Sequence, residues 1–186
     1  RRCSYKCYKR RILLQGGGLM SMWYVIWTST GQEHNYANEV GKRVKDATCF
    51  VPVRKINRKR KGQWYTEDAV LFPGYFFVDT EDITRVNTAL RSTEGFGTVL
   101  NTDREYMPLN FEETEFIDDL NKTGGVFDTS KGLIDGDQVK ITSGPLYGYK
   151  ANIRKIDRHK RRAYIEMDMF GKTIKTFVGL EIVERT

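Results

Sequence analysis

The sequence predicts an α+β domain, with an antiparallel sheet and helices, followed by a small all-β barrel. Before about residue 121, strand-like stretches alternate with helical stripes, whereas after about residue 135 short alternating strands follow one another. The charge changes near the same place: residues 21–133 hold 14 basic and 17 acidic residues, and residues 134–186 hold 11 and 7. This split indicates two domains with different partners, and a basic second domain suits a polyanion such as RNA.

The predicted parts are a basic extension, an α+β domain, a flexible linker and a barrel, at residues 1–21, 22–121, 122–134 and 135–186. The linker is predicted from its glycine and serine content. The first 20 residues hold six basic residues and no acid, and we expect the extension to be disordered or to precede a true start at Met20 or Met22. Gln15–Gly18 would then be a translated ribosome-binding site.

No stretch of about 20 apolar residues is present, and no small-residue cleavage site follows the short apolar run of the extension. We therefore expect a cytoplasmic protein without membrane contact. The cysteines Cys3, Cys7 and Cys49 provide no disulfide framework, and Cys3 and Cys7 lack the further ligands of a zinc site. We expect no metal and no cofactor.

The α+β domain begins with a predicted strand, Trp23–Thr28, that is apolar on both faces. Both faces should be covered, one by the domain's own helices, with a partner as a candidate cover for the other. Ala37, Val40 and Val44 then form a helical stripe, and Phe50–Val53 is predicted as a second strand.

A long basic hairpin is predicted next. Arg54–Lys61 holds six basic residues in eight, strand-like Gln63–Tyr65 follows, and the tip should lie near residues 58–62. The most apolar stretch, Val70–Val78, is predicted to bend at Pro73–Gly74.

Two more helices and one strand complete the domain. The helical stripes are Ile83, Val86 and Leu90, and Phe116, Ile117 and Leu120. Phe96–Leu100 is a short strand, and Asn110 with Glu113 matches the capping box of the last helix.

Period-two alternation predicts the strands of the barrel, with turns at Gly144–Pro145, Gly148 and Phe170–Gly171. The alternating apolar positions are Val139 and Ile141, Ala151 and Ile153, Ile165, Met167 and Met169, and Ile174, Thr176 and Val178.

Several segments together resemble the NusG family of transcription factors. Trp23–Val25, Gly31–Glu33 and Leu71–Tyr75 stand in the order of its N-terminal (NGN) domain. The segment Gly136–Pro145 resembles the KOW module that follows that domain, as does Phe170–Lys172. The basic run Asp157–Arg162 and the long hairpin are most similar to LoaP, a specialised antiterminator subfamily that reads an RNA hairpin.

The resemblance implies binding to the clamp region of RNA polymerase through an apolar depression of the first domain, with reduced pausing or termination as the result. The alternative for each of these residues is ordinary core. By position the depression would be lined by Trp27, Tyr75, Phe77, Phe96 and Leu100.

The barrel is expected to bind an RNA hairpin or the nascent transcript, with Tyr147 and Tyr149 as candidates for stacking on an unpaired base. A solvated, unpartnered barrel surface is the alternative. The candidate RNA-binding residues are Tyr149, Lys150, Arg154, Arg158, His159, Lys160, Arg161, Arg162, Lys172 and Lys175.

The basic hairpin is expected to contact a nucleic-acid backbone, either the transcript or DNA, with non-template DNA as a further candidate partner. The alternative is a solvated loop. The residues concerned are Arg54, Lys55, Arg58, Lys59, Arg60 and Lys61.

Other functions remain as alternatives. One is a housekeeping NusG-like factor that links polymerase to the ribosome or to a termination factor, and another is a ribosomal or RNA-binding KOW protein. An enzyme is not expected, because the sequence has no glycine-rich phosphate loop, metal-ligand set or nucleophile–base constellation. We expect a monomer.

Overall fold

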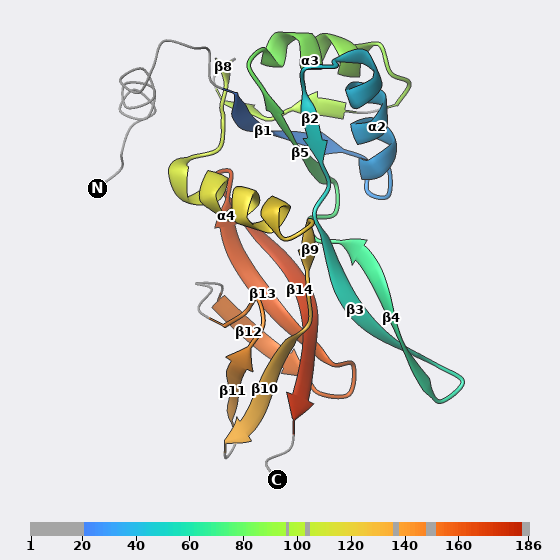
Figure 1. Cartoon of the computed structure of the whole chain (residues 1–186), viewed down its shortest axis with the longest axis vertical. Helices are drawn as coiled ribbons and strands as arrows, with labels where there is room; N and C mark the ends of the chain where they lie inside the picture. The colour runs from blue at the N-terminus through green and yellow to red at the C-terminus, as the bar shows by residue number, and fades with distance from the viewer. Residues whose placement is uncertain (1–20, 96, 103–104, 136–137, 148–151, 184–186) are drawn as a thin grey trace. The chain divides into compact units, whose positions relative to one another are not determined.

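The chain divides into two compact units, which Figure 1 shows with labelled helices and strands. Unit 1 comprises Arg1–Val51 and Pro73–Asp119, and unit 2 comprises Pro52–Phe72 and Leu120–Thr186. The computed structural model describes residues 21–95, 97–102, 105–135, 138–147 and 152–183.

Unit 1 is built on a four-stranded antiparallel sheet in the order β2-β5-β1-β6. Within it, Trp27 lies opposite Tyr75 on one side and opposite Thr98 on the other. The strands are β1 (Met22–Thr28), β2 (Thr48–Phe50), β5 (Tyr75–Thr80) and β6 (Gly97–Val99). A separate two-stranded sheet pairs β7 (Asn101–Thr102) with β8 (Glu105–Tyr106).

The three helices are α2 (Glu33–Arg43), α3 (Ile83–Arg91) and α4 (Phe111–Lys122). Asp82 caps α3 by accepting a hydrogen bond from the Thr84 amide at 2.9 Å. The capping box predicted for α4 is confirmed, since Asn110 N donates to Glu113 Oε2 at 2.9 Å and Glu113 N donates to Asn110 Oδ1 at 3.0 Å. None of the helices in the described part of the chain is long and apolar enough to cross a membrane.

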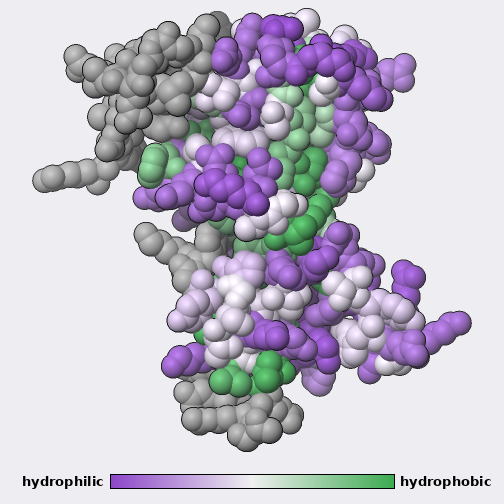
Figure 2. Space-filling model, in the orientation of Figure 1, coloured by the Kyte–Doolittle hydropathy of each residue, from purple (hydrophilic) through white to green (hydrophobic). Residues whose placement is uncertain are grey.

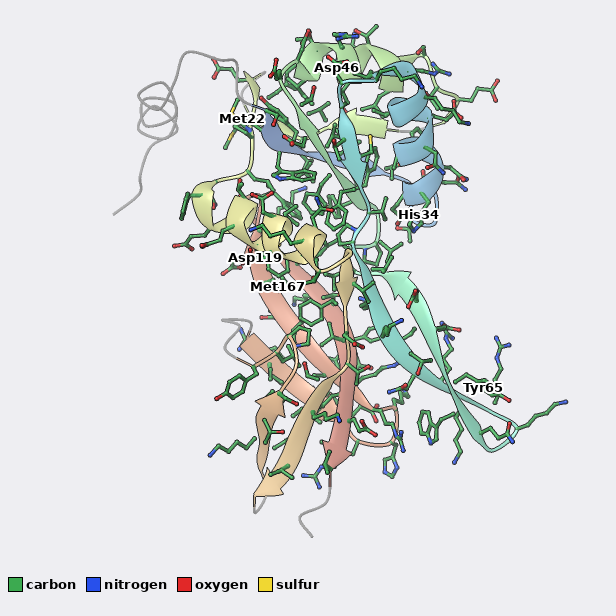
Figure 3. All side chains as sticks on the ribbon, viewed as in Figure 1. Met22, His34, Asp46, Tyr65, Asp119 and Met167 are labelled. Carbon is green, nitrogen blue, oxygen red and sulfur yellow. The ribbon has the colours of Figure 1, made fainter. Side chains whose placement is uncertain are left out.

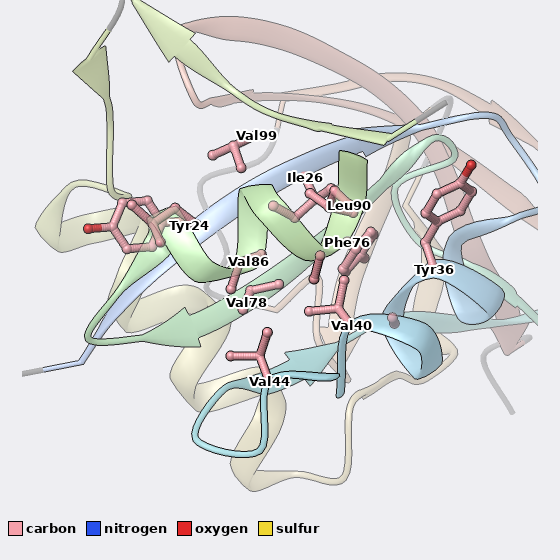
Figure 4. Packing of buried hydrophobic residues seen from close by; sticks show 13 residues of the cluster. Tyr24, Ile26, Tyr36, Val40, Val44, Phe76, Val78, Val86, Leu90 and Val99 are labelled. Carbon is pink, nitrogen blue, oxygen red and sulfur yellow. The ribbon is translucent and has the colours of Figure 1, made fainter. Parts of the chain in front are cut away.

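The core of unit 1 lies between one face of the sheet and helices α2 and α3 (Figure 4). Tyr24 and Ile26 of β1 alternate with residues of the other face, and Phe76 and Val78 of β5 lie beside them. The helical stripes predicted for α2 and α3 are confirmed. They supply Ala37, Val40, Val44, Ile83, Val86 and Leu90 to this core.

The opposite face of β1 is also covered over most of its length. Trp23 is buried, its Nε1 donates to Asp118 Oδ1 of α4 at 2.7 Å, and its ring lies 6.0 Å from that of Phe50. Val25 is buried on the same face, while Trp27 remains 45% exposed. The prediction that both faces of this strand are apolar and covered therefore holds except at Trp27.

Unit 2 contains the predicted long hairpin, formed by β3 (Val53–Arg60) and β4 (Gln63–Val70). Its tip is a two-residue turn in which Lys61 and Gly62 have φ values of 48° and 84°, typical of a type I′ hairpin. Strand β9 (Val126–Phe127) pairs with β3 in parallel and completes this three-stranded sheet.

The remaining strands of unit 2 form a five-stranded sheet in the order β11-β10-β14-β13-β12, and residues 135–186, predicted to be all-β, hold strands and no helix in their described part. Ile165, Met167 and Met169 are buried, and the acids between them are not, which confirms the alternation in β13. The strands are β10 (Ser130–Asp135), β11 (Gln138–Ser143), β12 (Asn152–Asp157), β13 (Arg162–Met169) and β14 (Lys172–Val183).

Phe50–Val53 is not one strand, contrary to the prediction. Strand β2 ends at Phe50, β3 begins at Val53, and the boundary between the units falls between Val51 and Pro52. Pro52 has no amide hydrogen to extend a ladder, although its carbonyl accepts a hydrogen bond from Leu71 N at 2.8 Å.

The segment predicted as a flexible linker, residues 122–134, holds β9 and most of β10. Ser130 is fully buried, and its Oγ accepts a hydrogen bond from the Leu146 amide at 2.9 Å. Glycine and serine content indicates only local flexibility. Strand β10 forms because β14, some 50 residues later, pairs with it in parallel. The basic hairpin also differs from the expected boundaries, since it belongs to unit 2.

Candidate nucleic-acid interface and apolar sheet face

The basic residues of the β3–β4 hairpin fall into two groups with different partners. On the shaft, Lys55 Nζ lies 3.1 Å from Asp68 Oδ1 on the facing strand, and Arg58 forms an ion pair with Glu67. These two acids neutralise the positive charges of Lys55 and Arg58. The tip is different, because within the described residues no carboxylate pairs with its exposed cations, which are Lys59, Arg60 and Lys61.

Arg54 is buried in unit 2 and so drops out of the predicted backbone-contacting set. Its Nη1 donates to the Leu71 carbonyl at 3.3 Å and to Thr176 Oγ1, and its guanidinium lies 4.0 Å from the ring centre of Phe177. Burial, together with the charge of nearby Arg162, lowers the pKa of Arg54 to about 10. Arg54 therefore joins β3 to β14 and does not face solvent.

The turn between β12 and β13 presents a run of exposed cations. Asp157 at its base accepts a hydrogen bond from the Lys160 amide at 2.9 Å, and that bond lowers the pKa of the Asp157 carboxyl. Arg161 closes the turn in the left-handed region, with φ 52°, and its carbonyl accepts from Leu180 N at 3.0 Å. Arg158 and His159 are exposed between them.

A tryptophan joins this turn to the hairpin. The guanidinium of Arg161 lies 4.5 Å from the ring centre of Trp64 on β4. Lys59, the cross-strand partner of Trp64, has its Nζ 5.8 Å from the same ring centre. Figure 3 shows the neighbouring Tyr65 on this hairpin near its tip, where it is half exposed.

Arg154 and Lys175 lie in a separate cluster around one carboxylate. Arg154 Nε is 2.7 Å from Glu166 Oε2, and Lys175 Nζ is 3.5 Å from Glu166 Oε1. The hydrogen bond from Arg154 lowers the pKa of Glu166. The structure thus places these two cations around an acid and apart from the Trp64 contact. Lys172 is exposed at the start of β14, and the predicted residues Tyr149 and Lys150 lie outside the described residues.

Three of the five residues predicted to line an apolar depression of unit 1 are at least partly exposed. Trp27 and Tyr75 are direct cross-strand partners, Trp27 is 45% exposed, and Tyr75 is half-buried. Leu100 is also half-buried, and its amide donates to the Val25 carbonyl at 2.9 Å. Phe77 is fully buried and is core in this structure, so it does not line an open depression. Phe96 lies outside the described residues.

A buried carboxylate in the motif Gly31–Glu33, which was not among the predicted site residues, positions this face. Glu33 is 1% exposed and accepts hydrogen bonds from Gly31 N at 2.8 Å and Gly74 N at 2.6 Å. The Gly74 carbonyl in turn accepts from Thr28 N at 2.8 Å. In the sequence, Glu33 belongs to the motif Gly31–Glu33 and lies at the start of a helix, where an acid usually indicates a favourable helix-dipole interaction at the surface.

Comparison with models of protein families shows which family this chain belongs to. Residues 21–118 match the family described as transcription termination factor nusG, and residues 136–166 match the KOW motif. The chain belongs to the NusG family.

Curated NusG relatives align along most of the chain. The transcription termination/antitermination protein NusG of Thermus thermophilus is 24% identical over 168 residues, covering 81% of this chain and 90% of its own length. That of Halalkalibacterium halodurans is 27% identical over 175 residues, covering 87% and 96%. A solved structure of Thermotoga maritima NusG, titled for its domain interaction, superposes with a TM-score of 0.57 at 21% identity, covering 87% of this chain and 96% of that one, which shows the shared fold.

In this NusG-family chain the segment matched to the first family model includes the β3–β4 hairpin, whereas the structure assigns the hairpin to unit 2. Two of the family motifs quoted from the sequence, Gly31–Glu33 and Leu71–Tyr75, contribute to the hydrogen bond between Glu33 and Gly74. NusG-family proteins are non-enzymatic transcription factors. In the described part of this chain no group of three or more His, Cys, Asp or Glu side chains could hold a metal ion.

Proposed function

We propose that this chain is a specialised elongation and antitermination factor. It binds RNA polymerase at the clamp through unit 1 and structured RNA through the basic surface of unit 2. The RNA half of the proposal rests on the β12–β13 turn, where Arg158, His159 and Lys160 are exposed. The nearest acid, Asp157, accepts a hydrogen bond from the turn backbone and lies 3.9 Å from Lys160 Nζ, so it offsets the charge of one of these residues.

Electrostatics supports an RNA partner for this turn. Cations that neutralise phosphates release condensed counterions, so a cluster of exposed Arg and Lys gains affinity for nucleic acid without needing base contacts. Tyr147, 67% exposed before β12, adds an aromatic that can stack on an unpaired base of a loop. A stem with a loop offers both features.

The polymerase half rests on Trp27 and Tyr75. A tryptophan that is 45% exposed, beside a half-buried tyrosine on a sheet, is typical of the anchor of a protein interface. Burying such a side chain stabilises a complex by roughly 1.5–3 kcal/mol, so few contacts are needed. A factor that holds the clamp in place while gripping the transcript would reduce pausing and termination.

One observation favours the housekeeping alternative. Tyr147, Ile153 and Val183 of unit 2 are large apolar side chains that are more than one-third exposed. Such residues suit a protein partner better than a phosphate backbone, and a ribosomal protein or a termination factor is the candidate.

Chromatin immunoprecipitation of this chain, with RNA polymerase mapped in parallel, tests the proposal. Occupancy that follows polymerase over a few operons from a shared transcribed leader supports recruitment by RNA. Occupancy on nearly every transcribed gene would favour the housekeeping alternative. Absence of overlap with polymerase would refute both and favour a ribosomal KOW protein.

A further inference from the structure

The tip of the β3–β4 hairpin and the β12–β13 turn meet at a single indole ring. The guanidinium of Arg161, from the turn, lies 4.5 Å from the ring centre of Trp64. The Nζ of Lys59, from the hairpin that carries Trp64, lies 5.8 Å from the same ring centre. Nearly 100 residues separate these elements in the sequence, yet both lie in unit 2. The term bridged basic surface is used below for Lys59, Arg60 and Lys61 of the tip with Arg158, His159, Lys160 and Arg161 of the turn.

The base of the hairpin is packed on the rest of unit 2, so the tip is not a free finger. Buried Arg54 of β3 donates to Thr176 of β14. The backbones also approach closely at Gly179, where an added Cβ would lie 2.8 Å from the Lys55 carbonyl oxygen. These contacts hold β3 against β14, and therefore hold the tip near the turn that begins after β12.

Charge on the bridged basic surface is less compensated than on the shaft of the hairpin, since among the described residues its one ion pair joins Lys160 Nζ to Asp157 Oδ2 at 3.9 Å. Acids on the facing strand neutralise Lys55 and Arg58, whereas residues 59–61 and 158–161 contain six Lys or Arg residues and no acid. Bringing two such groups together raises their mutual repulsion, which an anionic partner would relieve. On the face seen in Figure 2, the protruding end of the hairpin is hydrophilic.

The conformation of Arg161 points the same way. At φ 52° a residue without a Cβ, or an asparagine, is favoured, and a long side chain is not. Lys61 occupies the same region at the hairpin tip, with φ 48°. Both turns therefore carry a cation at a position where glycine or asparagine would be preferred.

We propose that the bridged basic surface is one RNA-binding site, in which the hairpin tip and the turn contact the backbone of the same RNA stem. This inference rests on the proposed function, since it names which residues hold the RNA. It also assigns the hairpin tip to RNA, where the sequence left the transcript and DNA open. An A-form stem is recognised largely through its phosphates and 2′-hydroxyls, and a surface with two cationic groups joined by an aromatic ring can contact phosphates on two sides of a groove.

The test measures binding of the full chain to a fluorescein-labelled RNA stem-loop, by anisotropy, over a series of KCl concentrations. The tip variant is Lys59→Gln/Arg60→Gln/Lys61→Gln, and the turn variant is Arg158→Gln/Lys160→Gln. Each lost phosphate contact should reduce the slope of log Kd against log salt by about one, so both variants should have clearly lower slopes and weaker binding. Trp64→Leu, which keeps every charge, should weaken binding by less than the tip variant.

The matched control is Lys131→Gln/Lys140→Gln, which removes two exposed lysines from β10 and β11, at the other end of the strand order from β12. It should leave the slope close to that of the wild type. All substituted lysines and Arg60 and Arg158 are exposed, so folding should be retained, and circular dichroism checks this.

The outcomes separate the two proposals. If the turn variant loses binding and the tip variant does not, the barrel alone holds the RNA, and the bridged surface is refuted while the proposed function stands. If the tip variant weakens binding to a DNA duplex of the same sequence but not to the RNA, the tip is a DNA contact and the bridged surface is again refuted. If neither variant changes RNA binding, both proposals fail.

Discussion

The amide of Gly74 donates a 2.6 Å hydrogen bond to the carboxylate of Glu33, a side chain that is 1% exposed. The same carboxylate accepts from Gly31, so one buried acid joins the turn before α2 to the turn before β5. Thr28, which follows Trp27, donates to the carbonyl of Gly74. Glu33 therefore determines how Trp27 and Tyr75 are presented at this end of the sheet.

Replacing Glu33 by Ala should destabilise unit 1. The change leaves the buried amide of Gly74 without an acceptor, which costs about 1–3 kcal/mol, whereas the amide of exposed Gly31 can be satisfied by water. Glu33→Gln keeps the volume and one acceptor oxygen, so its loss should be smaller. Urea denaturation followed by tryptophan fluorescence measures both, since Trp23 and Trp27 lie in unit 1. An Ala variant as stable as the wild type would mean that water replaces the carboxylate without cost.

Trp27→Ala should weaken binding to RNA polymerase with little effect on folding, because Trp27 is 45% exposed. Loss of an aromatic anchor of this kind costs about 2 kcal/mol, which is roughly thirtyfold in affinity. Biolayer interferometry with core polymerase measures it. Tyr65→Ala, at a half-exposed aromatic of unit 2, is the control and should bind polymerase normally. Equal affinity for wild type and Trp27→Ala would remove this residue from the interface.

Arg54→Met should be tolerated or stabilising, despite the loss of two hydrogen bonds. It removes a buried cation whose Nε has no partner among the described residues, and it relieves repulsion from Arg162. The Leu71 carbonyl still accepts from Thr176 Oγ1 at 2.9 Å. Arg54→Ala should cost about 2–3 kcal/mol, because it leaves a cavity where the long stem packed.

Hydrogen exchange of the slowest β14 amides compares these two variants with the wild type. The expected order of protection places Met at or above the wild type and Ala below both. If Met were as damaging as Ala, the guanidinium contacts with Thr176 and Phe177 would be essential to unit 2.

Gly144→Ala should destabilise unit 2 more than Gly62→Ala. Both glycines have φ near 90°, so both substitutions incur a backbone cost of about 1–2 kcal/mol. An added Cβ at Gly144 would lie 2.6 Å from the Cα of Ser130, whereas at Gly62 nothing lies within 4 Å. The difference between the melting temperatures of the two variants measures the steric part of the destabilisation. Equal melting temperatures would show that β10 moves away from the added Cβ without a cost in free energy.

Cys49 should react slowly with iodoacetamide in the folded protein. Burial raises the pKa of its thiol from 9.0 to about 11, because the thiolate is the charged form. Between these values the unfolded chain is deprotonated and the folded chain is not, so stability should fall as pH rises through this window. Peptide mass spectrometry after alkylation at increasing pH measures the rate at Cys49, with the urea-unfolded chain as reference. A native rate that levels off near pH 9 would contradict the burial effect.

Local patterns in the sequence determined much of this fold. The capping box of Asn110 and Glu113, the helical stripe through Val86 and Leu90, and the alternation in β13 all depend on neighbours within about four residues. The turn at Lys61–Gly62 is equally local. Periodicity and turn chemistry act at that range, so the elements could be predicted without knowing what they pack against.

Tertiary structure alone decided which elements belong together. The sequence does not show that Ser130–Asp135 pairs with β14, that Arg54 is buried beside Phe177, that Phe77 is core, or that Arg161 meets Trp64. Each depends on a partner tens of residues away, and the same basic or glycine-rich stretch reads as solvated or flexible when that partner is unknown. The free energy of such contacts comes from burial and pairing across the fold, and these are set by the packed chain as a whole.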